Sequence, residues 1–262
     1  MAQYQENATV IRIEQFSPTN FRLTLYCPSI AAGARPGQFV MIKTGSGKDP
    51  LLRRPFSLHQ TSVDGMIQIY FKVVGRGTDI LAQMRENETL SVFGPLGRGF
   101  RLNKITRTVI VGGGLGIAPL LFLAKENCRL KQDCGDDLIV LGARTKNEIE
   151  PLLDDFRQFG ISILIATDDG SLGHHGVVVQ ILEALQIPAE CTVYGCGPEP
   201  MLAGLSQLCA AREIPCQVSV ESVMACGMGA CLGCNREAAG GGYTHVCLNG
   251  PVYDAEDLLW NI

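Results

Sequence analysis

The sequence predicts a mixed β and α/β fold in three parts: an antiparallel β-barrel over residues 1–102, a doubly wound parallel-sheet domain over 103–222 and a small subdomain over 223–262. In the first part, short apolar stretches are separated by turn residues, as in small antiparallel barrels. From about residue 104, apolar strands alternate with Gly-rich turns and helical runs, which predicts a parallel sheet. The last part is rich in Gly and Cys and too short to bury its own core, so we expect bound metal to stabilise it.

The elements follow from these patterns in chain order. The strands expected in the barrel are residues 9–16, 21–28, 37–44, 66–75 and 89–95, with one helix over 78–84. In the second part, strands with their turns at 106–114, 136–144, 162–170 and 191–198 alternate with helices at 117–128, 148–159, 176–185 and 199–212. Each helix is long enough to return the chain to the start of the next parallel strand.

Composition excludes several classes of protein. The formal net charge is -4 and Lys and Arg form no cluster, which argues against a nucleic-acid partner. We find no run of about 18 apolar residues that could span a membrane, and the first residues lack the pattern of a signal peptide. We therefore expect a cytoplasmic protein whose 11 cysteines are reduced thiols or metal ligands. Those expected to be small buried side chains are Cys27, Cys128, Cys134, Cys191, Cys209 and Cys216.

Four cysteines near the end of the chain have the spacing of metal ligands. Cys226, Cys231, Cys234 and Cys247 form the pattern C-x4-C-x2-C-x12-C within the run that begins MACGMGACLGC. Gaps of four, two and a longer interval match the plant-type ferredoxin pattern for a [2Fe–2S] cluster. A structural zinc site remains the alternative, although such sites usually offer two C-x2-C pairs.

Two motifs in the barrel suit a ring cofactor that carries phosphate. The segment RPFS, residues 54–57, offers a guanidinium that can hold a phosphate with two hydrogen bonds and a hydroxyl that can bond a ring atom. The segment GRGT, residues 75–78, opens the expected helix and could direct backbone N–H groups at a pyrophosphate. Taken alone, RPFS could equally be a surface Arg beside a turn Pro.

Together these motifs resemble the flavin-binding barrel of the ferredoxin–NAD(P) reductase family. The resemblance implies that Arg54 holds the FAD diphosphate and that Ser57 lies near the flavin ring. Many members have Tyr at the position of Phe56, so a ring hydroxyl there is not expected in this chain. The residues that the resemblance assigns to FAD are Arg54, Pro55, Phe56, Ser57, Tyr70, Phe71, Lys72, Gly77 and Thr78.

The run VIVGGGLGIAPL predicts a dinucleotide site. It places Gly114 and Gly116 between a buried strand and a helix that begins near Pro119, where a helix N-terminus can meet a phosphate. The later run YGCGP, with Gly197 and Pro198, resembles the nicotinamide end of the same family, and the resemblance implies that Cys196 lies beside the reactive carbon of nicotinamide. The alternative for Cys196 is a buried thiol at a strand end.

The choice between NAD and NADP depends on residues at two other strand ends. Asp168 and Asp169 could accept hydrogen bonds from a ribose and would repel a 2′-phosphate, which favours NAD. The alternative is an Asx turn in TDDGSLG. Arg144 favours NADP instead, because a guanidinium can bind the extra phosphate.

Over nearly all of its length, the chain resembles the family of electron transfer subunits of type B, NAD-linked dihydroorotate dehydrogenases. The strings that carry this resemblance include RRPFS, VVGRGT, GGGLGIAPL, YGCGPEPM and MACGMGACLGC. It implies FAD, one [2Fe–2S] cluster and NAD as cofactors, and electron transfer to NAD+ in pyrimidine biosynthesis from an FMN-containing catalytic subunit, in a heterotetramer with two of each subunit. None of the four His residues lies in a recognisable catalytic motif, so we expect the substrate chemistry on that partner.

Two other functions remain open from the sequence. The chain could be the NAD(P)H-dependent reductase subunit of a hydrogenase, a ferredoxin transhydrogenase or an oxygenase, with electrons flowing outward. It could also be a zinc-stabilised nucleotide-binding regulator without redox activity.

Overall fold

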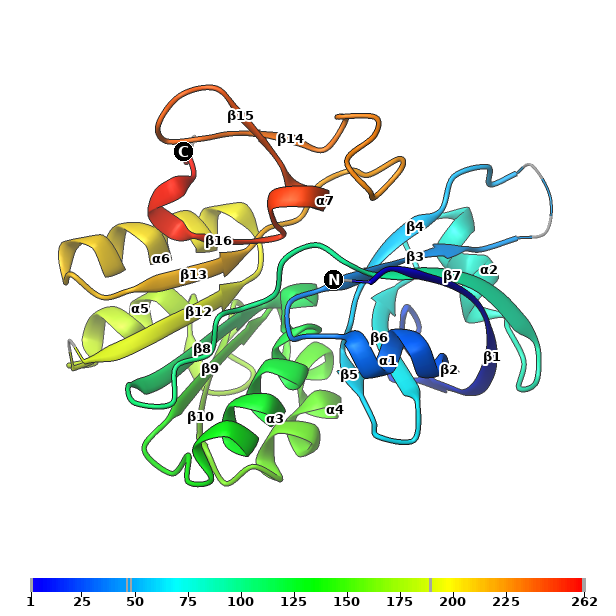
Figure 1. Cartoon of the computed structure of the whole chain (residues 1–262). Helices are drawn as coiled ribbons and strands as arrows, with labels where there is room; N and C mark the ends of the chain where they lie inside the picture. The colour runs from blue at the N-terminus through cyan, green and yellow to red at the C-terminus, as the bar shows by residue number, and fades with distance from the viewer. Residues whose placement is uncertain (1, 46, 48, 189, 261–262) are drawn as a thin grey trace.

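The computed structural model describes residues 2–45, 47, 49–188 and 190–260. Residue 1 of the first expected part and residues 261–262 of the third therefore lie outside the described residues. Figure 1 shows the N-terminal barrel on one side of the molecule, the α/β domain on the other, and the C-terminal segment above the α/β domain with a loop that reaches toward the barrel. Within the described residues, no helix combines the length and the apolar character needed to cross a lipid bilayer.

The N-terminal sheet is antiparallel throughout and curls into a half-barrel. Its strands follow the order β4-β3-β7-β1-β2-β6-β5, and β4 also contacts β6. The strands are β1 (Tyr4–Gln15), β2 (Asn20–Tyr26), β3 (Phe39–Lys43), β4 (Arg54–Ser57), β5 (Gln60–Thr61), β6 (Met66–Lys72) and β7 (Thr89–Leu96). Two short helices, α1 (Pro28–Gly33) and α2 (Arg76–Ala82), join them. The interior holds alternate side chains of every long strand, such as Leu23 and Leu25 of β2.

The second sheet is parallel except for its last strand. Its order is β11-β10-β9-β8-β12-β13-β16, so the chain reverses direction across the sheet between β8 and β12. The strands are β8 (Arg107–Gly113), β9 (Leu138–Ala143), β10 (Ser162–Thr167), β11 (His174–His175), β12 (Cys191–Cys196), β13 (Cys216–Ser219) and β16 (Val252–Asp254). In such sheets ligands bind beyond the carboxyl ends of the strands at this reversal.

Helices cover both faces of this sheet, as the sequence predicts. They are η1 (Gly114–Ile117), α3 (Leu120–Lys131), α4 (Lys146–Arg157), α5 (Val178–Ala184) and α6 (Glu199–Ala211). Side chains of α3 and α4 pack with Ile110 and Ile139 on one face, whereas α5 and α6 pack with Val109 and Val140 on the other. Alternate residues of each strand therefore enter different cores, which explains why residues 109–111 of β8 and 138–141 of β9 are continuous apolar runs.

The C-terminal segment packs on both domains. It contains β14 (Asn235–Glu237), β15 (Tyr243–His245), α7 (Val246–Asn249) and η2 (Ala255–Asp257), and its strand β16 pairs with β13 of the α/β sheet. Its core joins Cys234 and Cys247 to Met41 of β3 and to Val218 of β13. The division at residue 223 remains a prediction, because residues 252–254 extend the preceding sheet.

The sequence patterns missed several short elements. Helix α1 and strands β4, β5, β13 and β16 have two to six residues each, too few to display a period. The expectation of reduced thiols was wrong for one pair, because the structure joins Cys128 and Cys134 in a disulfide. Helix α3 ends at Lys131, and Gln132 adopts a left-handed conformation that turns the chain back and brings the two Cα atoms to 5.5 Å. Cys27, Cys191 and Cys209 are buried free thiols, as expected, and Cys216 is half-buried.

Candidate functional site

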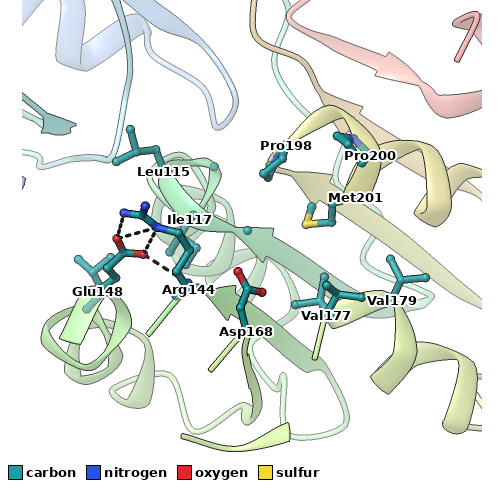
Figure 2. Close-up of a pocket in the computed structure, with 18 of the residues that line it drawn as sticks. Leu115, Ile117, Arg144, Glu148, Asp168, Val177, Val179, Pro198, Pro200 and Met201 are labelled. Carbon is teal, nitrogen blue, oxygen red and sulfur yellow. Dashed lines mark hydrogen bonds and ion pairs between the residues drawn. The ribbon is translucent and has the colours of Figure 1, made fainter. Parts of the chain in front are cut away.

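A cavity of about 720 Å³ opens at the carboxyl ends of β8 and β12, where the α/β domain meets the barrel (Figure 2). Its floor is the Gly-rich turn, residues 113–117, together with Gly197 and Pro198 after β12. Asn20, Tyr70 and Lys72 of the barrel form part of its wall. The cavity therefore lies at the reversal of the parallel sheet, where a nucleotide is expected.

The Gly-rich turn has the shape of a phosphate cradle. A Cβ on Gly116 would overlap the carbonyl oxygen of Cys196 and the nitrogen of Gly197, so only glycine lets the two turns touch. Gly114 has a φ of 55° and nothing within 4 Å of the position that its Cβ would take, so its backbone is open on the cavity side. Pro119 is the N-cap of α3. The turn therefore fits a dinucleotide, whose phosphates require close approach of the backbone.

Cys196 ends β12 directly below this cradle. Its side chain is 4% exposed and is not part of the cavity lining, whereas Gly197 and Pro198 are. Burial, with a contribution from Glu221, raises the pKa of the Cys196 thiol to about 12, although the Ser219 hydroxyl bonds to it. The thiol is therefore neutral, and a position beside nicotinamide remains a prediction.

The two acidic residues after β10 have different surroundings. Asp168 lines the cavity, and Figure 2 shows its carboxylate between Arg144 and Val177. The carboxylate of Asp169 instead accepts hydrogen bonds from the backbone N–H of Ser171, at 3.0 Å, and from its hydroxyl, at 2.6 Å. These bonds lower the pKa of Asp169 and form the Asx turn that the sequence left open. Asp168 is therefore the better candidate for a ribose contact.

Arg144 also lines the cavity but is already paired. Its guanidinium forms an ion pair with Glu148, which lies in the first turn of α4. The pair includes a bond of 3.1 Å from Nε to Oε1, and the dashed lines in Figure 2 mark these contacts. The same hydrogen bonds lower the pKa of Glu148. The pair neutralises the cation that could otherwise attract a 2′-phosphate.

Replacing Asp168 by Asn is expected to shift cofactor preference toward NADPH, because it removes the negative charge that would face a 2′-phosphate. We expect the ratio of kcat/KM for NADPH to that for NADH to rise about tenfold, equivalent to about 1.4 kcal/mol. Flavin reduction by each nucleotide, followed at 450 nm, measures this ratio. Asp169→Asn is the matched control, because an Asn oxygen can keep the bonds from Ser171. Equal shifts in both variants would contradict the assignment to Asp168.

Strand β6 directs its side chains alternately toward the cavity and into the barrel. Tyr70 and Lys72 line the cavity, whereas Phe71 is buried in the barrel core and stacks on Phe21 with ring centroids 5.8 Å apart. Phe56 of β4 is also buried and meets Phe71 edge-on. Of these residues, Tyr70 and Lys72 can offer side chains to a flavin, while Phe56 and Phe71 can offer only backbone groups. Burial raises the pKa of Tyr70 to about 12, which keeps its phenol protonated.

A second cradle lies over Gly77, at the start of α2. A Cβ on Gly77 would come within 3.2 Å of Arg54 Nε and 3.4 Å of Thr44 Oγ1, so both polar groups converge above this glycine. The Thr44 hydroxyl is buried without a hydrogen-bond partner among the residues that the structure describes. A guanidinium and an unsatisfied hydroxyl around a glycine fit the diphosphate of FAD.

The structure also shows the surroundings of three other residues that the resemblance assigns to FAD. The Thr78 hydroxyl accepts hydrogen bonds from the N–H groups of Val74 and Gly75, which fixes the start of α2. Pro55 pairs with Met41 in the sheet, and Ser57 is half-buried at the end of β4. Thr44 was missed in the sequence, although its hydroxyl follows directly after β3, which pairs with the strand that carries Arg54.

The four spaced cysteines lie in two contacting pairs, Cys226 with Cys231 and Cys234 with Cys247. In the described part of the chain, no three His, Cys, Asp or Glu side chains converge as they would on one metal ion. A zinc site needs all of its ligands around a single ion, whereas a [2Fe–2S] cluster has two irons that share four thiolates. Two pairs of thiols therefore fit the cluster better than zinc.

Backbone N–H groups point at the sulfur atoms, as expected around a cluster. Gly229 donates to Cys247 Sγ at 3.1 Å, and Cys231 donates to Cys226 Sγ at 3.4 Å. Burial raises the pKa of Cys226, but the N–H groups of Met228 and Cys231 outweigh it and lower the pKa to about 6. Gly227 and Gly229 have φ values of 73° and 81°, so the loop needs glycine to turn its N–H groups inward.

Comparisons with known proteins agree with this geometry. Residues 7–100 match the model of an oxidoreductase FAD-binding domain, and residues 221–259 match the iron-sulfur cluster binding domain of dihydroorotate dehydrogenase B. The chain is similar to a protein of Desulforamulus reducens named "Dihydroorotate dehydrogenase B (NAD(+)), electron transfer subunit", with 37% identity over 97% of this chain and 98% of the relative. A protein of the same name from Caldanaerobacter subterraneus subsp. tengcongensis is 42% identical over 86% of this chain and 87% of its own length.

Solved structures extend the comparison to the whole fold. A structure of an NADH-dependent reduced ferredoxin-NADP oxidoreductase superposes with a TM-score of 0.85 at 28% identity, covering 97% of this chain and 90% of that chain. A ferredoxin reductase of carbazole 1,9a-dioxygenase superposes with a TM-score of 0.71 at 22% identity, covering 82% of this chain and 68% of that chain. The second similarity concerns the fold alone.

Proposed function

The chain belongs to the family of dihydroorotate dehydrogenase B electron transfer subunits, and on that basis we propose that it carries electrons from a dihydroorotate-oxidising catalytic subunit to NAD+. A bound [2Fe–2S] cluster supplies one-electron transfer, and bound FAD supplies the exchange between single electrons and the hydride that NAD+ accepts. The residues of the chain hold these groups in order.

The observation that carries the proposal is the position of the paired thiols between the surface and the barrel. Gly227 lies against Met41 of β3, so that a Cβ there would overlap the Met41 side chain. Strand β3 pairs with β4, which carries Arg54 and Ser57, and the cavity opens beside β6 of the same half-barrel. Cluster loop, flavin strands and nucleotide cavity are therefore contiguous, as an electron relay requires.

We further propose that the catalytic partner docks on the cluster loop. Cys231 is exposed, and the apolar side chains of Val223, Met228, Leu232 and Leu248 around the loop are exposed as well. Exposed apolar residues in one region are typical of a protein interface. The partner is proposed to hold FMN and to assemble with this chain two by two in the cytoplasm. It is also proposed to carry the acid–base chemistry on dihydroorotate, because we find no arrangement for that chemistry among the residues that the structure describes. For example, the His59 ring bonds a backbone carbonyl and the His174 ring bonds Gln180.

One solved structure supports a second candidate function. The similarity to an NADH-dependent reduced ferredoxin-NADP oxidoreductase extends over nearly the whole chain. A partner that delivers electrons from ferredoxin would meet the same relay. The higher identity to the dihydroorotate dehydrogenase subunits favours the first function.

Anaerobic purification of the full chain is expected to give a brown protein with about one FAD, two irons and two acid-labile sulfides per chain, because we assign FAD to the cradle over Gly77 and the cluster to the two thiol pairs. The visible spectrum, iron and zinc analysis, and flavin release measure this content. Addition of NADH should bleach the flavin band within the anaerobic cuvette. Stoichiometric zinc in place of iron, or a colourless protein that binds NADH, would contradict the proposal.

A further inference from the structure

His59 is a buried polar residue that the relay described above does not use. It lies between β4 and β5, its side chain is 0% exposed, and its backbone N–H donates to the carbonyl of Gln68 on β6. It does not line the cavity. Burying an imidazole in an apolar barrel costs free energy unless its ring nitrogens are hydrogen-bonded.

The imidazole joins the two walls of the cavity from behind. Its Nδ1 lies 2.5 Å from the carbonyl oxygen of Ala118, and since a carbonyl can only accept, Nδ1 carries the proton. Its ring also packs against the ring of Tyr70, with centroids 5.8 Å apart. Ala118 follows directly after Ile117 in the Gly-rich turn, and both Ile117 and Tyr70 line the cavity. One side chain therefore contacts the flavin wall and the nucleotide wall together.

Burial keeps this imidazole neutral. Desolvation lowers the pKa of His59 to about 4, although the bond to Ala118 opposes that shift. The other ring nitrogen, Nε2, is buried without a hydrogen-bond partner in the described part of the chain. The bond from Nδ1 is therefore the polar contact that the His59 side chain makes within the described residues.

Two other polar contacts between the two domains lie away from the cavity. Lys125 of α3 donates from Nζ to the carbonyl of Thr61, at 2.7 Å, and Arg22 of β2 forms an ion pair with Asp155 of α4, at 2.6 Å. None of these four residues lines the cavity. These contacts can hold the domains together without setting the distance between Tyr70 and the Gly-rich turn.

We infer that His59 is a positioning residue that aligns the bound nicotinamide with the flavin by fixing the Gly-rich turn against Tyr70. The inference rests on the proposed function. Hydride transfer is sensitive to alignment, and a displacement of about 1 Å can reduce its rate about a hundredfold. Affinity for NADH depends on contacts spread over the whole cavity, so it should depend little on His59.

Replacement of His59 by Asn and by Gln separates alignment from simple packing. The amide nitrogen of Asn lies near the position of Nδ1 and can donate to Ala118, whereas that of Gln reaches the position of Nε2. We expect His59→Gln to lower the limiting rate of flavin reduction by NADH about tenfold or more, with the dissociation constant of NADH changed less than about twofold. His59→Asn should retain a limiting rate within about threefold of the unmodified chain.

The measurement is anaerobic stopped-flow absorbance of the full chain with its FAD and cluster, over a range of NADH concentrations. Lys125→Met is the matched control for a lost contact between the domains and should leave the limiting rate unchanged. Equal slowing by Asn and Gln, an effect on NADH affinity alone, loss of FAD from the Gln variant, or equal slowing by Lys125→Met would each overturn the inference. Failure of the proposed function would differ, because NADH would then not reduce the flavin of the unmodified chain.

Discussion

Replacing Cys234 by Ser is expected to lower the rate of dihydroorotate-dependent NAD+ reduction, in the complex with the catalytic subunit, by at least about a hundredfold. Cys234 is buried and forms one of the two thiol pairs with Cys247, so its loss leaves one iron with a single thiolate. NADH oxidation with a small artificial acceptor should change less than about threefold, because the cradle at Gly77 and the cavity lie in other parts of the chain.

Cys216→Ser is the matched control for this experiment, since Cys216 is a free thiol at the start of β13 and belongs to neither cluster pair. It should retain the cluster band and the full rate. The visible spectrum, the iron content and both activities are measured on the same preparations. A Cys234→Ser complex that reduced NAD+ with dihydroorotate at the normal rate would show that the cluster is not on the route of the electrons.

The long periodic segments could be predicted from the sequence. Residues 109–111 of β8 and 138–141 of β9 are continuous apolar runs because both faces of the sheet are covered, and the helices of this domain bury one face each. The sequence also singles out Cys226, Cys231 and Cys234 by gaps of four and two residues, with Cys247 further on, and their role as iron ligands remains a prediction. Gly116 could be placed in a turn between a strand and a helix, although the close contact with the turn after β12 that requires a glycine there is seen only in the structure.

Contacts between distant segments could not be predicted. Thr44 and Arg54 meet above Gly77 only after β3 and β4 pair, and no spacing in the sequence encodes that meeting. Nothing local distinguishes Asp168 from Asp169, because the turn after β10 decides which carboxylate faces the cavity and which bonds Ser171. The same holds for His59, whose partner Ala118 belongs to the other domain.

Without its partner, the chain is expected to oxidise NADH with artificial acceptors but to show no turnover of dihydroorotate. Mixing with the catalytic subunit should create dihydroorotate-dependent NAD+ reduction, because the substrate chemistry belongs to that subunit and the relay to this one.

Met228→Glu tests where the two subunits meet. The Met228 side chain is 51% exposed beside the cluster loop, and a charge there would lose its hydration in an apolar interface. We expect a loss of at least about tenfold in affinity for the catalytic subunit.

Val63→Glu is the matched control for that surface, since Val63 is 102% exposed in the turn between β5 and β6 of the barrel. It should assemble normally, and both variants should keep the cluster spectrum and the NADH oxidation of the isolated chain. Titration of the catalytic subunit, with NAD+ reduction as the readout, gives the affinity of each variant. A one-electron carrier must lie close to its donor. A partner that bound Met228→Glu as tightly as the unmodified chain, but bound Val63→Glu poorly, would therefore place the docking surface on the barrel and rule out entry of electrons at the cluster loop.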